Sequence, residues 1–333
     1  MRDGVTPRAG ALVLAVLAVQ LAFIASYIGA FHKPSPHRIP IAVTAPAQRL
    51  DALARQLDTL PGAPLDARPV ADEATARRMI EHREVYGAFV VSATDATDRL
   101  IIASGAGASA GQALEQIFTP LEDAQDRAFT LEDVKPALLG DARGLSGFYL
   151  ALGWVVGGYL VAIALSASKG ARPANPHRAA IRLLSLLAYA LLSGLGGALI
   201  ATAVTGAGAG HLAQLAWFGA LLVLASGAVT MALQAALGFA GTGVAVLLFV
   251  VLGNPSAGGA YPAPLLPTFW RTIGPWLPPG LGTDAIRGIV YFDGAGVRRS
   301  ALVLSSYALL GVLGTLLASG GATRIAAIVP RRR

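Results

Sequence analysis

Six long apolar runs alternate with polar segments along the 333-residue chain. The first covers residues 9–31 and is interrupted only by Gln20, Ser26 and glycines. The other five contain no Asp, Glu, Lys or Arg and cover residues 146–168, 183–205, 212–232, 237–253 and 300–320. About 20 apolar residues cross the roughly 30 Å hydrocarbon core of a bilayer. The pattern therefore predicts an α-helical polytopic membrane protein with six transmembrane helices.

The first apolar run has a second interpretation, a cleaved signal peptide. Signal peptides have an apolar core of roughly 7–15 residues and a small-x-small cleavage site. The run at 9–31 is longer than that and leads into Phe31-His32-Lys33-Pro34. We expect an uncleaved anchor, so that residues 1–31 form a cytoplasmic N-terminus and the first transmembrane helix.

Residues 32–145 change to a pattern typical of a small α/β domain. Short β-branched runs predict strands at 38–44, 65–70, 88–91 and 100–103, and helical periodicity predicts helices at 47–60, 71–86 and 112–128. Residues 135–144 would form a linker. The expected order is βαβαββα, inserted between the first two transmembrane helices.

Residues 254–299 are too polar and too broken to form one spanning helix, and seven prolines fall between Pro255 and Pro279. Proline removes a backbone donor and fixes φ, so one spanning helix is excluded. Aromatic residues favour the membrane–water boundary. We expect a folded cap or a re-entrant element at one face of the bilayer, with a short amphipathic helix at 283–291 that places Ile286, Ile289 and Val290 on one face and Asp284 and Arg287 near the opposite face. The cap is either a packing lid or a gate, and its candidate residues are Tyr261, Phe269, Trp270, Trp276, Asp284, Arg287, Tyr291 and Phe292.

Composition supports a membrane location, and the charged residues are distributed unevenly along the chain. The chain is 54% hydrophobic and 14% charged, against about 25% charged in soluble domains. Residues 32–145 hold 16 of the 19 acidic residues, and the remainder of the chain has a net charge of +11. The net charge of +7 therefore belongs to the membrane flanks and does not indicate a nucleic-acid partner.

The basic flanks predict the orientation in the cell membrane. Arg2 and Arg8 precede the first span, and basic residues follow the second and the sixth. Both termini are expected in the cytoplasm, with residues 32–145 and the cap outside. The membrane domain would cover 146–320, followed by a basic cytoplasmic tail at 321–333. The inner basic residues are Lys169, Arg172, Arg178 and Arg182, and Arg324 with 331–333.

Motifs for chemistry are largely missing from the sequence. There is no P-loop and no cysteine, and the five histidines have no metal-ligand spacing. The turn Ser104–Gly107 before a predicted helix reads either as a phosphate cradle or, as we favour, a flexible turn. Spans without ionisable residues argue against proton-driven antiport and intramembrane proteolysis. We expect no enzyme, cofactor or metal. Gly153 with Gly157, and Gly194, Gly196 and Gly197, suggest helix-packing faces.

The layout and several motifs carry a resemblance to a known family. The motifs are Asn254–Pro262, Leu266-Pro267 with Phe269, Trp276–Gly280, Asp284–Arg287, Tyr291–Gly294 and, in the α/β segment, Glu84–Ala88. Nearly the whole chain resembles the YhgE/Pip (phage infection protein) family and the related SNG1-like membrane proteins, which belong with the ABC type-2 exporter permeases. The resemblance implies a dimer that exports a hydrophobic or amphipathic substrate, powered by a separate ATPase subunit.

Two functional hypotheses follow. In the first, the chain is a permease-like subunit that moves an amphipathic or lipid-like substrate outward, with residues 169–182 as the ATPase-coupling loop and the cap as the gate. In the second, it is a membrane-anchored scaffold or receptor whose α/β domain binds a partner. Homo- or heterodimers and membrane lipid are expected partners in the first hypothesis.

Overall fold

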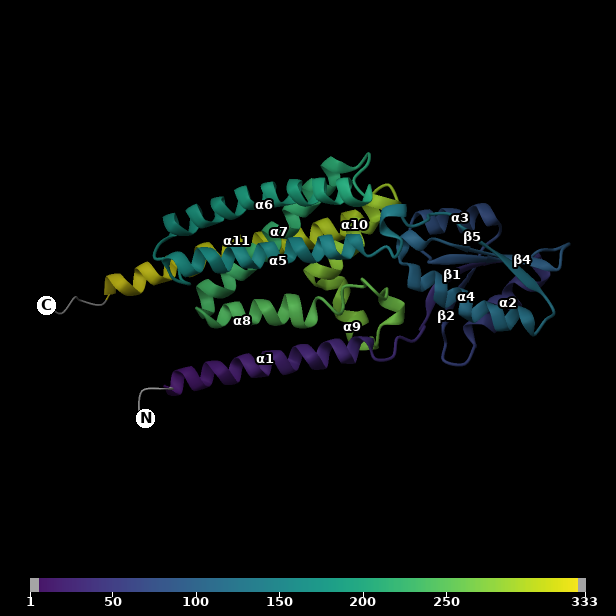
Figure 1. The fold of residues 1–333 in the computed structure, drawn as a ribbon, viewed down its shortest axis with the longest axis horizontal. Coiled ribbons are helices and arrows are strands. Elements are labelled where there is room, and N and C mark those ends of the chain that lie inside the picture. The colour runs from purple at the N-terminus through teal and green to yellow at the C-terminus, as the bar shows by residue number, and fades with distance from the viewer. Residues whose placement is uncertain (1–5, 329–333) are drawn as a thin grey trace.

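Long apolar helices form most of the computed structural model, which describes residues 6–328 (Figure 1). Five helices are long and apolar enough to cross a bilayer, so the chain is a helical membrane protein. They are α1 (Pro7–Phe31), α5 (Ser146–Lys169), α6 (Pro176–Thr205), α7 (Leu212–Leu237) and α11 (Val297–Ile328). The start of α1 and the end of α11 lie at one end of the molecule, and the sheet lies at the other.

The structure differs from the predicted span at 237–253. Helix α7 continues to Leu237, and Gly238 ends it with a φ of 65°. The next helix consists of α8 (Ala240–Val246) and the π-helical turn η3 (Leu247–Leu252). At about 1.5 Å per residue it is roughly 20 Å long, short of the roughly 30 Å core. Among the described residues there are thus five candidate spans and one shorter apolar helix.

Helix α7 is the centre of the membrane part and contacts α5, α6, α8, α10 and α11. Small residues let the backbones approach at these crossings. A Cβ atom on Gly194 would lie 2.4 Å from the Ala216 carbonyl oxygen, and one on Gly158 would lie 2.6 Å from that of Val223. The expected face at Gly153 and Gly157 is wrong in part, because nothing lies within 4 Å of a Cβ on Gly153.

Residues 39–133 form a five-stranded sheet with the strand order β2-β1-β3-β4-β5. Strand β1 is parallel to β2 and β3, β3 is antiparallel to β4, and β4 is parallel to β5. The strands are β1 (Ile39–Thr44), β2 (Leu65–Pro69), β3 (Gly87–Val90), β4 (Thr97–Ile102) and β5 (Ala128–Asp133), and the helices are α2 (Ala47–Asp58), α3 (Glu73–Glu81) and α4 (Ala108–Asp123). The four predicted strands are confirmed with shifted ends, whereas β5 was not predicted. We call residues 39–133 the α/β unit.

The cap, residues 254–299, is built of short helices rather than one span. They are η4 (Ala263–Leu265), α9 (Thr268–Ile273), η5 (Gly274–Trp276) and α10 (Pro278–Tyr291). Helix α10 starts earlier than the predicted 283–291, because Pro278 and Pro279 fit the first turn of a helix. Ile286 and Ile289 are buried as expected. The placement of Arg287 on a polar face was wrong, because its side chain is only 5% exposed.

The cap also completes both cores of the α/β unit. Leu265 is buried on one side of the sheet with Phe89 and Phe118, whose rings stack at 4.2 Å. On the other side, Phe292 is buried with Ile80 and its neighbours. Apolar burial contributes roughly 25 cal/mol per Å², so the α/β unit is held on the cap by the same force that folds it.

Candidate functional site

Arg83 joins the α/β unit to the cap. Its Nη2 lies 2.5 Å from Asp284 Oδ1, and its Nη1 donates to the carbonyl oxygens of Asp284 at 3.0 Å and Ala295 at 3.3 Å. The guanidinium carbon lies 5.5 Å from the centre of the Phe292 ring, within range of a cation–π interaction. These contacts place an arginine that follows α3 directly over α10.

Arg287 is the buried charge of the cap. Its Nη1 donates to the Gly258 carbonyl at 2.7 Å, and its Nη2 donates to the Gly259 carbonyl at 2.8 Å. Its Nε has no hydrogen-bond partner among the residues that the structure describes. Burial lowers the pKa of Arg287, although a guanidinium stays protonated in proteins. The cap therefore holds a desolvated cation with unused donor capacity.

Two adjoining cavities of about 150 and 240 Å³ form a crevice between the cap and the α/β unit. Both are lined by Arg83, Tyr86, Ala106, Asp284 and Arg299, and Arg287 lines the smaller one. Burial raises the pKa of Tyr86, so this phenol is neutral at physiological pH. Three arginines thus face the crevice against one carboxylate, which leaves its lining positively charged.

The turn Ser104–Gly107 packs against this crevice. A Cβ atom on Gly105 would lie 2.6 Å from Tyr291 Cδ1 and 3.0 Å from the Lys135 carbonyl oxygen. One on Gly107, whose φ is 135°, would lie 3.8 Å from Arg287 Nη2. The turn is therefore a close-packed contact with the cap rather than the flexible turn that we expected.

The structure divides the eight predicted cap residues into three groups. Tyr261 and Trp270 face α1: Trp270 Nε1 donates to Ser26 Oγ at 3.3 Å, and the ring of Tyr261 lies 5.9 Å from that of Phe31. Phe269 and Trp276 are exposed, and Arg299 lies over the Trp276 ring. The remaining four face the α/β unit or the crevice and are Asp284, Arg287, Tyr291 and Phe292.

The predicted coupling loop at 169–182 is shorter than expected, because α6 already begins at Pro176 with Asn175 as its N-cap. Arg172 donates to the Ala236 carbonyl at 2.9 Å, and the buried Arg182 donates to the Gly170 carbonyl at 2.9 Å. Arg178 is exposed on the first turn of α6. The Lys169 side chain lies outside the described residues. Arg172 and Arg182 thus close the connection between α5, α6 and α7.

An apolar groove of about 520 Å³ lies between α6, α7, α11 and the end of α10. Gln214 is the only side chain in its lining able to form hydrogen bonds apart from the exposed Trp217. Its lining is Leu187, Leu191, Gln214, Trp217, Phe218, Ala220, Leu221, Leu224, Ile289, Gly294, Val297 and Ala301. The groove and the crevice lie on different faces of the first turns of α11.

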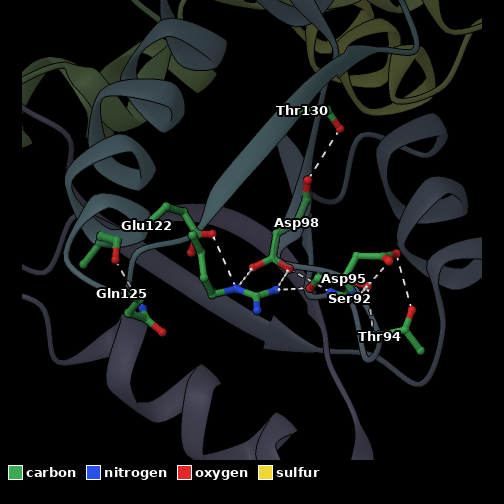
Figure 2. Close-up of polar contacts among 9 residues, drawn as sticks. Ser92, Thr94, Asp95, Asp98, Glu122, Gln125 and Thr130 are labelled. Atoms are coloured by element: carbon green, nitrogen blue, oxygen red, sulfur yellow. Dashed lines mark hydrogen bonds and ion pairs between the residues drawn. The ribbon is translucent and has the colours of Figure 1, made fainter.

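A second polar cluster, which was not predicted from the sequence, lies within the α/β unit (Figure 2). Arg127 pairs with the buried Asp98, its Nε at 3.0 Å from Asp98 Oδ2. Glu122 Oε2 lies 4.0 Å from Arg127 Nε and has no hydrogen-bond partner within the described part of the chain. Burial, with the neighbouring Asp98 carboxylate, raises the pKa of Glu122 to about 7. The sequence offered one signal for the burial of Glu122: it follows the buried Phe118 by four positions on α4, so both lie on the same helix face.

Within residues 6–328, no group of three or more His, Cys, Asp or Glu side chains is placed to hold a metal ion. Comparison with known proteins found no matching family model, curated protein or solved structure.

Proposed function

We propose that the chain is a permease-like membrane subunit that moves an amphipathic or lipid-like substrate outward, powered by a separate ATPase. The apolar groove carries this proposal. Its volume of about 520 Å³ falls within the roughly 300–1,000 Å³ of ligand sites, and its lining is almost entirely apolar.

The groove has the length of one bilayer leaflet. It extends along α7 from Gln214 to Leu224, which corresponds to about 15 Å at 1.5 Å per residue. Half of a roughly 30 Å hydrocarbon core has the same thickness. The end of the groove near Gln214 lies at the cap, next to Ile289 and Gly294. An acyl chain entering beside the cap would therefore fill it to the bilayer centre.

The groove is tested by filling it. Leu187 lines the groove and is 41% exposed, and Leu160 on α5 lies outside it and is 50% exposed. The protein is placed in nanodiscs with a phosphatidylcholine that carries a photoreactive diazirine in one acyl chain. We expect labelling of α6 and α7 that falls several-fold in Leu187→Trp and stays unchanged in Leu160→Trp. Equal labelling in both variants would remove the groove as the substrate site.

The ATPase is tested by a mild-detergent pull-down of the tagged chain from its native membrane. Arg178 is the informative position, because Arg172 and Arg182 are hydrogen-bonded within the chain. We expect a stoichiometric ATPase to co-elute, to be lost in Arg178→Glu, and to be retained in Arg49→Glu, which changes an exposed arginine of α2. Recovery of the chain without any ATPase would reject the powered permease.

The edge strand β5 favours a scaffold or receptor as the second candidate. It pairs only with β4 within the described sheet, and Leu131 on it is 46% exposed. An unpaired edge can accept a strand from another chain. Under this hypothesis a surface partner would be lost in Leu131→Lys and kept in Leu139→Lys, which changes a fully exposed leucine outside the sheet.

A further inference from the structure

The crevice between the cap and the α/β unit contains an incompletely satisfied cluster of cations. Arg83 is neutralised by Asp284, whereas Arg287 and Arg299 have no acidic partner within salt-bridge distance among the described residues. Arg287 uses two of its five N–H donors on the Gly258 and Gly259 carbonyls, and its Nε is unpartnered although the side chain is 95% buried. A buried, unpaired charge of this kind is destabilising unless an anion completes it.

The crevice is open to solvent at one end and buried at the other. Asp284 has a side chain that is 52% exposed, and Arg299 is exposed on the first turn of α11. Arg287 forms the buried end. Because Arg299 lies two residues after the start of a helix long enough to span, we expect the opening at the level of the lipid headgroups.

We propose that this crevice binds a phosphate group, held between Arg287 at its buried end and Arg299 at its mouth, with the neutral Tyr86 beside them. Guanidinium groups match the oxygens of phosphate and donate to them bidentately. The two unneutralised arginines suit the charge of about −1.5 to −2 that a phosphate monoester carries. Cavities of about 150 and 240 Å³ accept such a group with a small substituent. The site stands whether or not the chain transports a substrate.

The bound phosphate group belongs either to a lipid headgroup or to a soluble molecule, and the following experiment distinguishes these two sources. The full chain, purified in a neutral maltoside detergent, is unfolded thermally with sodium phosphate, with sodium acetate at equal ionic strength, and with micelles containing phosphatidic acid or phosphatidylcholine. A ligand at ten times its Kd raises Tm by about 2 °C or more in a chain of this size. A shift with inorganic phosphate indicates a soluble source, and a shift with phosphatidic acid alone indicates a lipid.

The matched variants are Arg299→Gln and Arg298→Gln, which remove neighbouring exposed charges of which only the first lines the crevice. We expect the shift to be lost in Arg299→Gln and retained in Arg298→Gln. Arg287→Lys is a second variant that keeps the buried charge but loses the planar fork, and we expect it to reduce the shift. An equal shift with acetate, an equal shift in the Arg299→Gln and Arg298→Gln proteins, or no shift with any probe would overturn the proposal.

Discussion

Arg83 and Asp284 are separated by 201 positions in sequence, yet they form the polar contact between the α/β unit and the cap. Asp284 is half exposed, so solvent screens the ion pair and its Coulomb energy is small. Two further bonds from Arg83 reach backbone carbonyls, and these are lost together with the side chain. Most of the contribution of Arg83 to stability therefore comes from its hydrogen bonds to backbone carbonyls rather than from the ion pair.

A double-mutant cycle tests this contact. Arg83→Ala is expected to lower the free energy of unfolding by about 1–3 kcal/mol, because it removes the hydrogen bonds from Arg83 to the Asp284 and Ala295 carbonyls. Asp284→Ala alone should cost less. Urea unfolding of the two single variants and the double variant gives the coupling, which we expect above about 0.5 kcal/mol. Strictly additive losses would show that the two side chains act independently.

Glu122 gives the α/β unit a pH-dependent stability. Folding raises its pKa from an ordinary 4.5 to about 7, so between these values the folded state binds the proton more tightly than the unfolded one. Its contribution is therefore present at low pH and is lost as the pH rises through about 7. At 1.36 kcal/mol per pKa unit, the loss is on the order of 3 kcal/mol.

The variant Glu122→Gln isolates this effect, since Gln is neutral at every pH. We expect its Tm to match the wild type at pH 4 and to exceed it by about 3 °C or more at pH 8. Thermal unfolding between these pH values provides the measurement, and Glu115→Gln, on an exposed position of α4, is the control. The prediction fails if both variants change the pH profile alike.

At the residue scale, the sequence predicts to which segment a residue belongs, but it does not predict which atoms its side chain contacts. Tyr261 and Trp270 were placed outside a single span because they lie between prolines. Arg287 was placed toward solvent, since a helical wheel of α10 carries no information about Gly258 and Gly259.

At the scale of elements, α1 is attached mainly by its C-terminal end. Exposed apolar side chains cover much of its length, and its polar contacts are made by Ser26 and Tyr27, which bond Trp270 and Asn254. A Cβ atom on Gly29 would lie 2.7 Å from Trp270 Cη2. The fit of α1 against α9 therefore depends on a position without a side chain.

Gly29→Val is expected to displace α1 from Trp270 and to lower Tm by several degrees, on the order of 1–3 kcal/mol for a clash of this kind. Gly10→Val is the control on the same helix, because no atom of residues 6–328 that the structure describes lies within 4 Å of a Cβ at that position. Thermal unfolding in detergent compares the two proteins. A similar Tm for both would show that α1 does not depend on this contact.

Strands were predicted well where the side chains are apolar and buried almost without interruption. Strands β1 and β3 were found because their side chains are mostly buried and apolar. Strand β5 was missed because its residues are largely exposed and include Thr130, Glu132 and Asp133. The prediction ended helix α7 too early, at residue 232. The residues Leu233–Leu237 favour a helix, and Gly238 ends it.

For the whole molecule, the start of α1 and the end of α11 lie at the end opposite the sheet. This arrangement agrees with the proposed topology, in which both termini are cytoplasmic and the α/β unit is outside. The absence of cysteine from the sequence makes the topology directly measurable, because any introduced cysteine is the only one.

We expect a membrane-impermeant maleimide to label Glu115→Cys on intact cells and to leave Ala174→Cys unlabelled until the membrane is opened. Both positions are exposed, the first on α4 and the second between α5 and α6. Labelling of the permeabilised cells controls for reactivity. The reverse pattern would invert the topology and place the crevice in the cytoplasm.

The short helix of α8 and η3 has a consequence for the bilayer around it. It covers roughly 20 Å beside α1, which is long enough to span, and Phe239 and Leu247 of this region are exposed. Lipid tails beside the helix meet about 10 Å too little apolar surface for a roughly 30 Å core. Hydrophobic mismatch of this kind is relieved by local thinning of the bilayer. On this side of the protein, a polar headgroup would then have a shorter distance to travel between leaflets.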